Sequence, residues 1–296
     1  MVRLVALTLV AVVLGVAAVS SPRLATAEHL TNWPPLLNCP DVNANTGVDM
    51  GDIFAVAAKF GTSYPDNDYL LLYDVDGGGH VTIQDIFHVA GQFGQVCPLI
   101  ETQAAQAALA TVKYLDPAQA EADGYTWFSQ YIPQMGVHLI NEDFQRLYPD
   151  FESQLEHPVG LLYTETEPGS NQPAELIGLW YNLPVGAVCT YYEIAGPCQS
   201  NADPPIGFGL TNDDEDNVDP PGIQFGWHTH AGLCSWNLGS IDAFLQEYGP
   251  DSEQTCIDDG GQVWFSTYGW MTHLYTIIPN PDGRFQAWNL NPGVAW

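Results

Sequence analysis

The sequence predicts an α+β protein. A small all-α module built from a duplicated segment is followed by a mainly β domain, an antiparallel sandwich or barrel, with an N-terminal helix. Residues 52–61 (DIFAVAAKFG) return 33 positions later as residues 85–94 (DIFHVAGQFG), and each copy directly follows a loop rich in Asp and Asn. After about residue 125 the chain consists of short aromatic and β-branched runs broken by Gly, Pro and Asn, which is typical of strands in a sandwich or barrel.

The N-terminal residues 1–27 have the pattern of a secretion signal. Arg3 precedes an apolar run over residues 4–19, and Ala25-Thr26-Ala27 forms a small-residue cleavage motif. The alternative is a membrane anchor, because the run is close to spanning length; the cleavage motif favours a signal peptide. We therefore expect a secreted, extracellular protein with no membrane association after signal removal, beginning with a linker over residues 28–38.

The charge balance limits the classes of partner. The chain holds 6 Lys and Arg against 35 Asp and Glu, a formal net charge of −29. Such a surface repels nucleic acid and anionic lipid, and it attracts divalent cations. Nucleic acid is therefore excluded as a partner.

The two acidic loops predict a pair of Ca²⁺ sites. Alternating oxygen-bearing side chains that run into a short helix are typical ligands of this hard cation. The alternative, an Asx-rich turn that only caps a helix, is disfavoured because the pattern occurs twice in register. Gly78 stands where a third ligand of the second loop would lie, so we expect that site to be the weaker one. The side-chain ligands are Asp41, Asn43, Asn45, Asp49 and Asp52 in the first loop, and Asp74, Asp76, Thr82 and Asp85 in the second.

Residues 39–97 resemble a type I dockerin. Each loop has the form D-x-[ND]-x-[ND] followed by V-x-x-x-D, with Val48 and Val81 at the apolar position, and each is followed by a single helix. The resemblance implies an EF-hand-like module that binds two Ca²⁺ ions and docks to a cohesin domain on a scaffold or cell surface. It also implies backbone carbonyl ligands at Gly47 and His80, and a setting of polysaccharide breakdown.

The match to the dockerin pattern has one further departure besides Gly78. Thr46 stands where the loop usually has Gly, and Gly47 follows one residue late. By resemblance, cohesin contact is expected at Met50-Gly51 in the first loop and Ile83-Gln84 in the second. The two pairs differ, which disfavours docking in two interchangeable orientations.

Six cysteines in a secreted chain indicate three disulfides. Several connectivities are possible, and the spacing favours one in which the first pair brackets the repeat and the other two close local loops. The favoured pairs are Cys39 with Cys97, Cys189 with Cys198, and Cys234 with Cys256.

Residues 98–296 form the predicted effector domain, beginning with a helix over residues 101–114. Its informative residues are His228 and His230, which lie two apart in an extended run and so point to one face. His273 from another strand and His138 are further candidates for a site that would suit Zn²⁺, Cu²⁺ or non-haem iron. The alternatives are a structural histidine cluster and metal-free acid–base chemistry.

The activity of this domain stays open at the level of sequence. The domain holds eight of the chain's nine tryptophans, which suit either a carbohydrate-binding cleft or a β core. If it is an enzyme, we expect a metal-dependent hydrolase or oxidoreductase in polysaccharide degradation, with no catalytic residue assigned. The alternative is a non-enzymatic glycan- or surface-binding protein. The domain is also similar to uncharacterised secreted bacterial proteins, which carries no activity with it.

Overall fold

The structure is a computed structural model, and it describes residues 34–183 except 67, 133, 149, 168 and 171, residue 208, and several C-terminal segments. Those segments are residues 233–235, 262–264, 270–281, 283–286, 289 and 291. Within this part of the chain, helices and an antiparallel sheet are both present, so the α+β class is confirmed. No helix there is both long and apolar enough to cross a bilayer.

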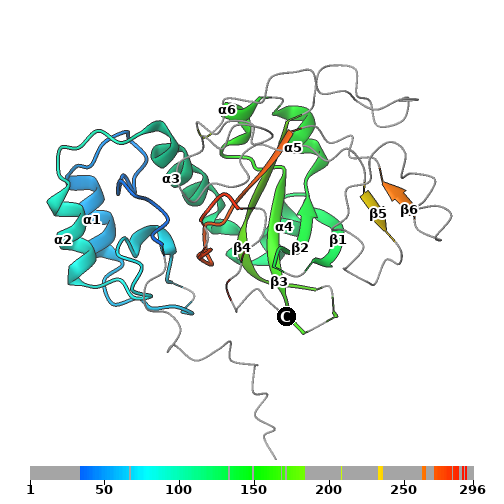
Figure 1. The fold of residues 1–296 in the computed structure, drawn as a ribbon, viewed down its shortest axis with the longest axis horizontal. Helices are drawn as coiled ribbons and strands as arrows, with labels where there is room; N and C mark the ends of the chain where they lie inside the picture. Colours follow the sequence, from blue (N-terminus) through cyan, green and yellow to red (C-terminus); the bar gives the residue numbers. More distant parts are fainter. Residues whose placement is uncertain are drawn as a thin grey trace, which may run out of the picture.

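The repeat folds into two short helices, α1 (Met50–Ala58) and α2 (Ile83–Gly91), with a 3-10 helix (Leu71–Tyr73) between them. Each helix starts with a reciprocal cap. Asp49 caps α1 and Asp52 returns to the Asp49 backbone, while Thr82 and Asp85 do the same for α2. Such a capping box satisfies otherwise unpaired N–H groups in the first turn. The two helices lie side by side at one end of the molecule (Figure 1).

Helix α3 (Leu99–Thr111) lies between this helix pair and the sheet (Figure 1). It is buried over much of its length because alanines such as Ala104 and Ala108 let neighbouring elements approach closely. The chain continues through a 3-10 helix (Val112–Leu115) and α4 (Pro117–Ala122), which begins with an Asp116 cap and proline at its first position. The predicted helix at the entrance of the second domain is thus present.

A five-stranded antiparallel sheet forms the centre of the C-terminal part. Its order is β1 (Thr126–Ile132), β2 (Gly136–Ile140), β3 (Gly160–Glu165), β4 (Pro173–Leu183) and β7 (Trp270–Leu274). Helices α5 (Glu142–Leu147) and α6 (Phe151–Gln154) lie in the β2–β3 connection, and β5 (Leu233–Ser235) pairs with β6 (Gln262–Trp264) as a separate ribbon. In the described part of the chain the five-stranded sheet is open, ending at β1 and β7, and the other sheet is the two-stranded ribbon, so neither a sandwich nor a closed barrel is shown there.

Both faces of the five-stranded sheet are buried. One face, including Leu139, Leu161 and Tyr181, belongs to a hydrophobic cluster that continues through α3 into the repeat, where Val56 and Val89 are fully buried. The opposite face carries a smaller cluster around Leu162, Trp180, Tyr275 and Ile278. Apolar packing is therefore continuous from the repeat to the first face, and the second face has a core of its own.

Candidate metal centres

The two loops of the repeat are held in place reciprocally. The N–H of Val48 in the first loop donates to the carbonyl of Gln95, just after α2, over 2.9 Å. The N–H of Val81 in the second loop donates to the carbonyl of Thr62, just after α1, also over 2.9 Å. Each loop is thus fixed by the chain that follows the other helix, and the sequence duplication is matched by duplicated geometry.

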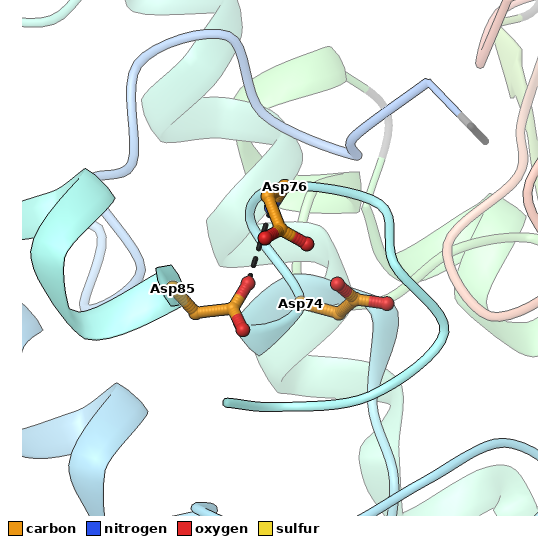
Figure 2. A group of neighbouring side chains, drawn as sticks. All are labelled: Asp74, Asp76 and Asp85. Carbon is orange, nitrogen blue, oxygen red and sulfur yellow. Dashed lines mark hydrogen bonds between the residues drawn. The ribbon is translucent and has the colours of Figure 1, made fainter. Parts of the chain in front are cut away.

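Three carboxylates converge in the second loop. Asp74 follows the 3-10 helix, Asp76 lies in the loop, and Asp85 projects from the first turn of α2 (Figure 2). One oxygen from each lies within 4.8 Å of the others. Asp74 and Asp85 are fully buried, whereas Asp76 is exposed. An acidic group of this kind suits a divalent cation with oxygen ligands.

Hydrogen bonds from backbone N–H groups hold two of these carboxylates, those of Asp74 and Asp85, in position. Asp74 accepts from Gly78 (2.9 Å) and Gly79 (2.7 Å), and Asp85 accepts from the N–H groups of Asp76 (3.1 Å) and Thr82 (2.7 Å). Burial is the main cause that raises the pKa of Asp74 to about 6, although its hydrogen bonds act in the opposite direction. A bound cation would offset the repulsion between the acids and favour the ionised carboxylate.

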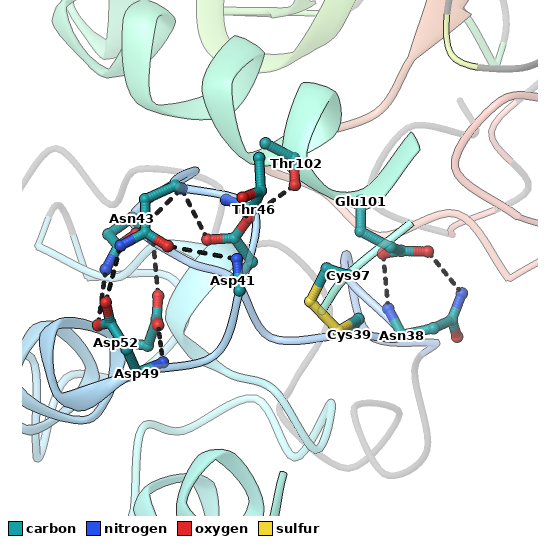
Figure 3. Close-up of a disulfide and its surroundings, with 12 residues drawn as sticks. Asn38, Cys39, Asp41, Asn43, Thr46, Asp49, Asp52, Cys97, Glu101 and Thr102 are labelled. Carbon is teal, nitrogen blue, oxygen red and sulfur yellow. Dashed lines mark hydrogen bonds between the residues drawn. A yellow bond between two sulfur atoms is a disulfide. The ribbon is translucent and has the colours of Figure 1, made fainter. Parts of the chain in front are cut away.

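The first loop repeats this backbone pattern (Figure 3). Asp41 accepts from the N–H groups of Asn45 (2.9 Å) and Thr46 (2.8 Å). Asp52 accepts from those of Asn43 (3.0 Å) and Asp49 (2.7 Å). Asp41 and Asp52 are therefore the structural equivalents of Asp74 and Asp85, and both are fully buried.

The remaining side chains differ between the loops. In the first loop, the amides of Asn45 and Asn43 donate to Asp49, over 2.9 and 3.4 Å, and hydrogen bonding led by Asn45 lowers the pKa of Asp49. Among the described residues, three acids come within 4.8 Å of one another in the second loop, and no such trio forms in the first. The carboxylates thus gather more closely in the loop that has the Gly78 gap.

The remaining predicted ligands lie at the edges of the two loops. Gly47 forms a β-bridge with Val96, and His80 forms one with Ser63. The His80 ring nitrogen Nδ1 also lies 2.8 Å from the Ser63 hydroxyl. Thr82 caps α2 and accepts from the backbone of that helix, and Gly78 brings only its backbone to the loop. The carbonyl ligands at Gly47 and His80 stay predictions.

Backbone conformation confirms that Thr46 occupies a glycine position. Thr46 has φ 81°, and its equivalent in the second loop, Gly79, has φ 77°. Ala44 has φ 58°, and its equivalent is Gly77 with φ 71°. Left-handed backbone is costly for residues with a Cβ, and most of all for a β-branched one. The first loop is therefore strained at two positions where the second is relaxed.

Two hydroxyl groups donate hydrogen bonds to Asp41 and Asp74, the buried aspartates that begin the two loops. Thr102, from the first turn of α3, donates to Asp41 over 2.7 Å (Figure 3), and Tyr69 donates to Asp74 over 2.5 Å. Neither residue belongs to the repeated pattern, and no sequence motif marks them. Through Thr102, the first loop is in direct contact with the helix that leads to the sheet.

The disulfide between Cys39 and Cys97 closes the repeat, with Cα atoms 5.6 Å apart (Figure 3). This pairing is confirmed. Cys189, Cys198 and Cys256 lie outside the described residues, and only the backbone of Cys234, on β5, is described. Their predicted pairings stay predictions.

Among the predicted histidine ligands, the structure brings His138 and His273 together. They come from β2 and β7, which are separated by two strands, yet their ring centres lie 6.3 Å apart at nearly right angles. Both are buried, and burial is the main cause that lowers the pKa of His138 to about 4. His228 and His230 lie outside the described residues.

Large apolar side chains are exposed on the repeat in matched pairs. They lie at equivalent positions of the two helices and of the turns that follow them. Exposed apolar surface of this extent is typical of interaction sites. The pairs are Met50 and Ile83, Phe54 and Phe87, and Phe60 and Phe93.

Comparisons with family models, curated proteins and solved structures found no match for the chain. The class of the protein is therefore inferred from its own fold and side chains. The fold and the loops define an α+β protein in which a duplicated acidic-loop unit is joined through α3 to an antiparallel sheet.

Proposed function

We propose that the chain is a secreted protein whose duplicated loops bind Ca²⁺ and so hold a docking surface for a cohesin-type domain on a scaffold or cell surface. The observation that carries this proposal is the equivalence of the two loops. Asp41 and Asp52 accept backbone hydrogen bonds in the same pattern as Asp74 and Asp85, 33 residues later. An acidic turn that only caps a helix would not need a second loop with the same arrangement of hydrogen bonds.

The donor set fits two Ca²⁺ ions. Buried carboxylates supply charge, and amides, carbonyls and water complete the oxygen coordination that Ca²⁺ needs. Ca²⁺ at each loop would neutralise two buried aspartates and fix the start of the adjacent helix, because Asp52 and Asp85 are also the helix-capping acids. The second loop offers one protein ligand fewer, at Gly78, so we assign it the weaker affinity.

The docking surface that fits this role is formed by the exposed pairs on α1 and α2. Phe54 and Phe87 are 64% and 68% exposed, although helices normally turn such residues inward. Since both helices begin at the Ca²⁺ loops, cation binding would order the surface that carries them. Ca²⁺-dependent docking follows from this connection.

The C-terminal part would be the effector that the repeat delivers. We assign it a histidine-based transition-metal site drawn from His138, His273, His228 and His230, acting as a metal-dependent hydrolase or oxidoreductase in polysaccharide breakdown. Two of these four imidazoles share one buried sheet face, which supports the assignment. The competing function is non-enzymatic glycan or surface binding with structural histidines, which the tryptophan-rich composition favours.

Binding to immobilised type I cohesin domains tests the docking proposal. The mature chain should bind in excess Ca²⁺ and dissociate in EDTA, and Phe54→Ser with Phe87→Ser should abolish binding without changing Ca²⁺ uptake. Exchange of two exposed apolar residues outside the module, Trp127→Ser and Leu147→Ser, is the matched control. Binding that ignores EDTA, or no binding to any cohesin tested, would contradict the proposal. A glycan array tests the competing function on the same protein.

A further inference from the structure

The buried face of the sheet opposite the repeat contains a polar centre. His138 and Leu162 lie opposite each other on β2 and β3, and Trp180 and His273 lie opposite each other on β4 and β7. Register and alternation place all four side chains on one face. Polar groups are rare in such a position unless they have a partner or a ligand.

Two glycines make room for this centre. Gly160 on β3 lies opposite Trp180, and a Cβ there would overlap the indole ring. Gly178 on β4 lies opposite Leu162 in the same row as His138, and a Cβ there would meet the backbone of Leu274 and Tyr275 at the end of β7. Gly160 thus leaves space for the indole of Trp180, Gly178 lets β7 approach β4 closely, and the rings of His138 and His273 lie near each other beside that indole.

The hydrogen bond of His138 determines its tautomer. Its Nδ1 atom lies 3.2 Å from the carbonyl oxygen of Gly136, and a carbonyl only accepts, so Nδ1 carries the proton. In the neutral ring, Nε2 then presents a lone pair. A backbone carbonyl that orients one imidazole nitrogen while the other binds a metal is a common arrangement around metal-ligating histidines.

The two rings are close enough to share an ion after a small movement. An imidazole nitrogen binds Zn²⁺ at about 2.0–2.1 Å, so the centres of two rings on one tetrahedral ion lie roughly 5 Å apart. The observed distance is 6.3 Å, so the rings would approach each other by about 1 Å on binding. In addition, the indole Nε1–H of Trp180 is buried and has no hydrogen-bond acceptor among the described residues. That N–H is an available donor to a water or anion on such an ion.

We propose that His138 and His273 are two ligands of one borderline transition-metal ion, of the Zn²⁺ or Cu²⁺ class, and that Trp180 donates to a water or anion bound to it. This inference rests on the metal-binding part of the proposed function and specifies the residues of that site. Hard cations such as Ca²⁺ are excluded because both ligands are nitrogens.

Zn²⁺ binding to the mature chain in excess Ca²⁺ tests the proposal. Equilibrium dialysis with metal analysis should give one equivalent of Zn²⁺, and both His138→Gln and His273→Gln should weaken its affinity at least about tenfold. His157→Gln is the matched control, since this imidazole stacks on Tyr148 away from the site and should leave Zn²⁺ binding unchanged. Wild-type uptake below half an equivalent, or unchanged affinity in both variants, would overturn the proposal.

A second measurement uses the unmodified chain, so its result does not depend on whether the histidine variants fold. Cu²⁺ bound to the unmodified chain should show magnetic coupling to at least two nitrogens in electron paramagnetic resonance, and coupling to none would overturn the inference. If Zn²⁺ binding depends on His228 and His230 but not on His138 or His273, this inference fails while the broader metal assignment survives. Ca²⁺-dependent cohesin binding is measured in parallel, and its result does not depend on whether the histidines bind Zn²⁺.

Discussion

The carboxylate of Glu101 and the guanidinium of Arg284 form a buried ion pair through two parallel hydrogen bonds of 2.9 and 2.8 Å. Glu101 lies in the first turn of α3, and Arg284 lies in the segment that follows β7. The same carboxylate accepts from the backbone N–H of Asn38, over 2.8 Å, at the start of the repeat (Figure 3). One acidic side chain thus joins the repeat, the helix that follows it and the C-terminal segment.

Breaking this ion pair should lower the stability of both parts together. Glu101→Gln leaves a buried guanidinium without its counter-charge, and such a loss typically costs about 3–5 kcal/mol. We expect a single unfolding transition at a lower Tm, measured by calorimetry in excess Ca²⁺. The exposed Asp143–Arg146 pair supplies the control, because Asp143→Asn should change stability by less than about 1 kcal/mol. Two separate transitions in Glu101→Gln, with the repeat unaffected, would contradict the coupling.

Relieving left-handed strain in the first loop should stabilise the protein. Thr46→Gly puts glycine where the second loop already has Gly79, and it should raise the free energy of unfolding by about 1 kcal/mol. Ala57→Gly in the exposed part of α1 is the opposite control and should cost about 1 kcal/mol. Denaturant unfolding of both variants gives the two values. A destabilised Thr46→Gly would show that the threonine side chain contributes more than its strain costs.

Filling the gap in the second loop should strengthen its Ca²⁺ affinity. Gly78→Asn copies Asn45 of the first loop and adds one oxygen ligand, so we expect roughly tenfold tighter binding at that site. A Cβ at Gly78 would meet only the Asp76 carboxylate, a flexible side chain that can shift. Gly91→Asn, where a Cβ meets nothing within 4 Å, is the control. Unchanged calorimetric affinity in Gly78→Asn would mean that the loop does not use this position.

The contribution of Glu175 to stability should fall as the pH rises from about 4.5 to about 7. Burial raises the pKa of this β4 residue from 4.5 to about 7. The folded state therefore keeps a proton that the unfolded state releases between these values, and folding loses at most about 3 kcal/mol across that window. Tyr64 is an ionisable neighbour of Glu175 and is neutral throughout this range. Glu175→Gln should reduce the loss between pH 5 and pH 8, as followed by Tm; an identical pH profile in the variant would contradict this assignment.

In the repeat, regular spacing carries information about structure. Its candidate ligand residues and apolar positions recur after 33 residues, and the two cysteines that bracket it form the predicted Cys39–Cys97 disulfide. The ligands themselves stay predictions. Thr102 and Arg284 could not be predicted, because tertiary packing brings each to a partner far away in the sequence. Tyr69 lies only five residues from Asp74, but no repeated pattern marks it. The spacing of residues along the sequence does not indicate these contacts.

The sheet was predicted only in outline. Short apolar runs indicate strands but not their order, and β7 pairs with β4 across a long intervening segment. The same limit applies to the histidines. Nothing in the local pattern around His138 distinguishes it, yet the order of the strands places its ring centre 6.3 Å from that of His273. This closeness depends on topology, which the local sequence does not carry.

Calorimetric titration of the chelator-treated chain with Ca²⁺ tests the central claim most directly. We predict two bound ions, one lost in Asp41→Ala and the other lost in Asp74→Ala, with stoichiometry unchanged in the exposed control Glu142→Gln. A chain that binds no Ca²⁺, or that keeps both ions in both aspartate variants, would contradict the account.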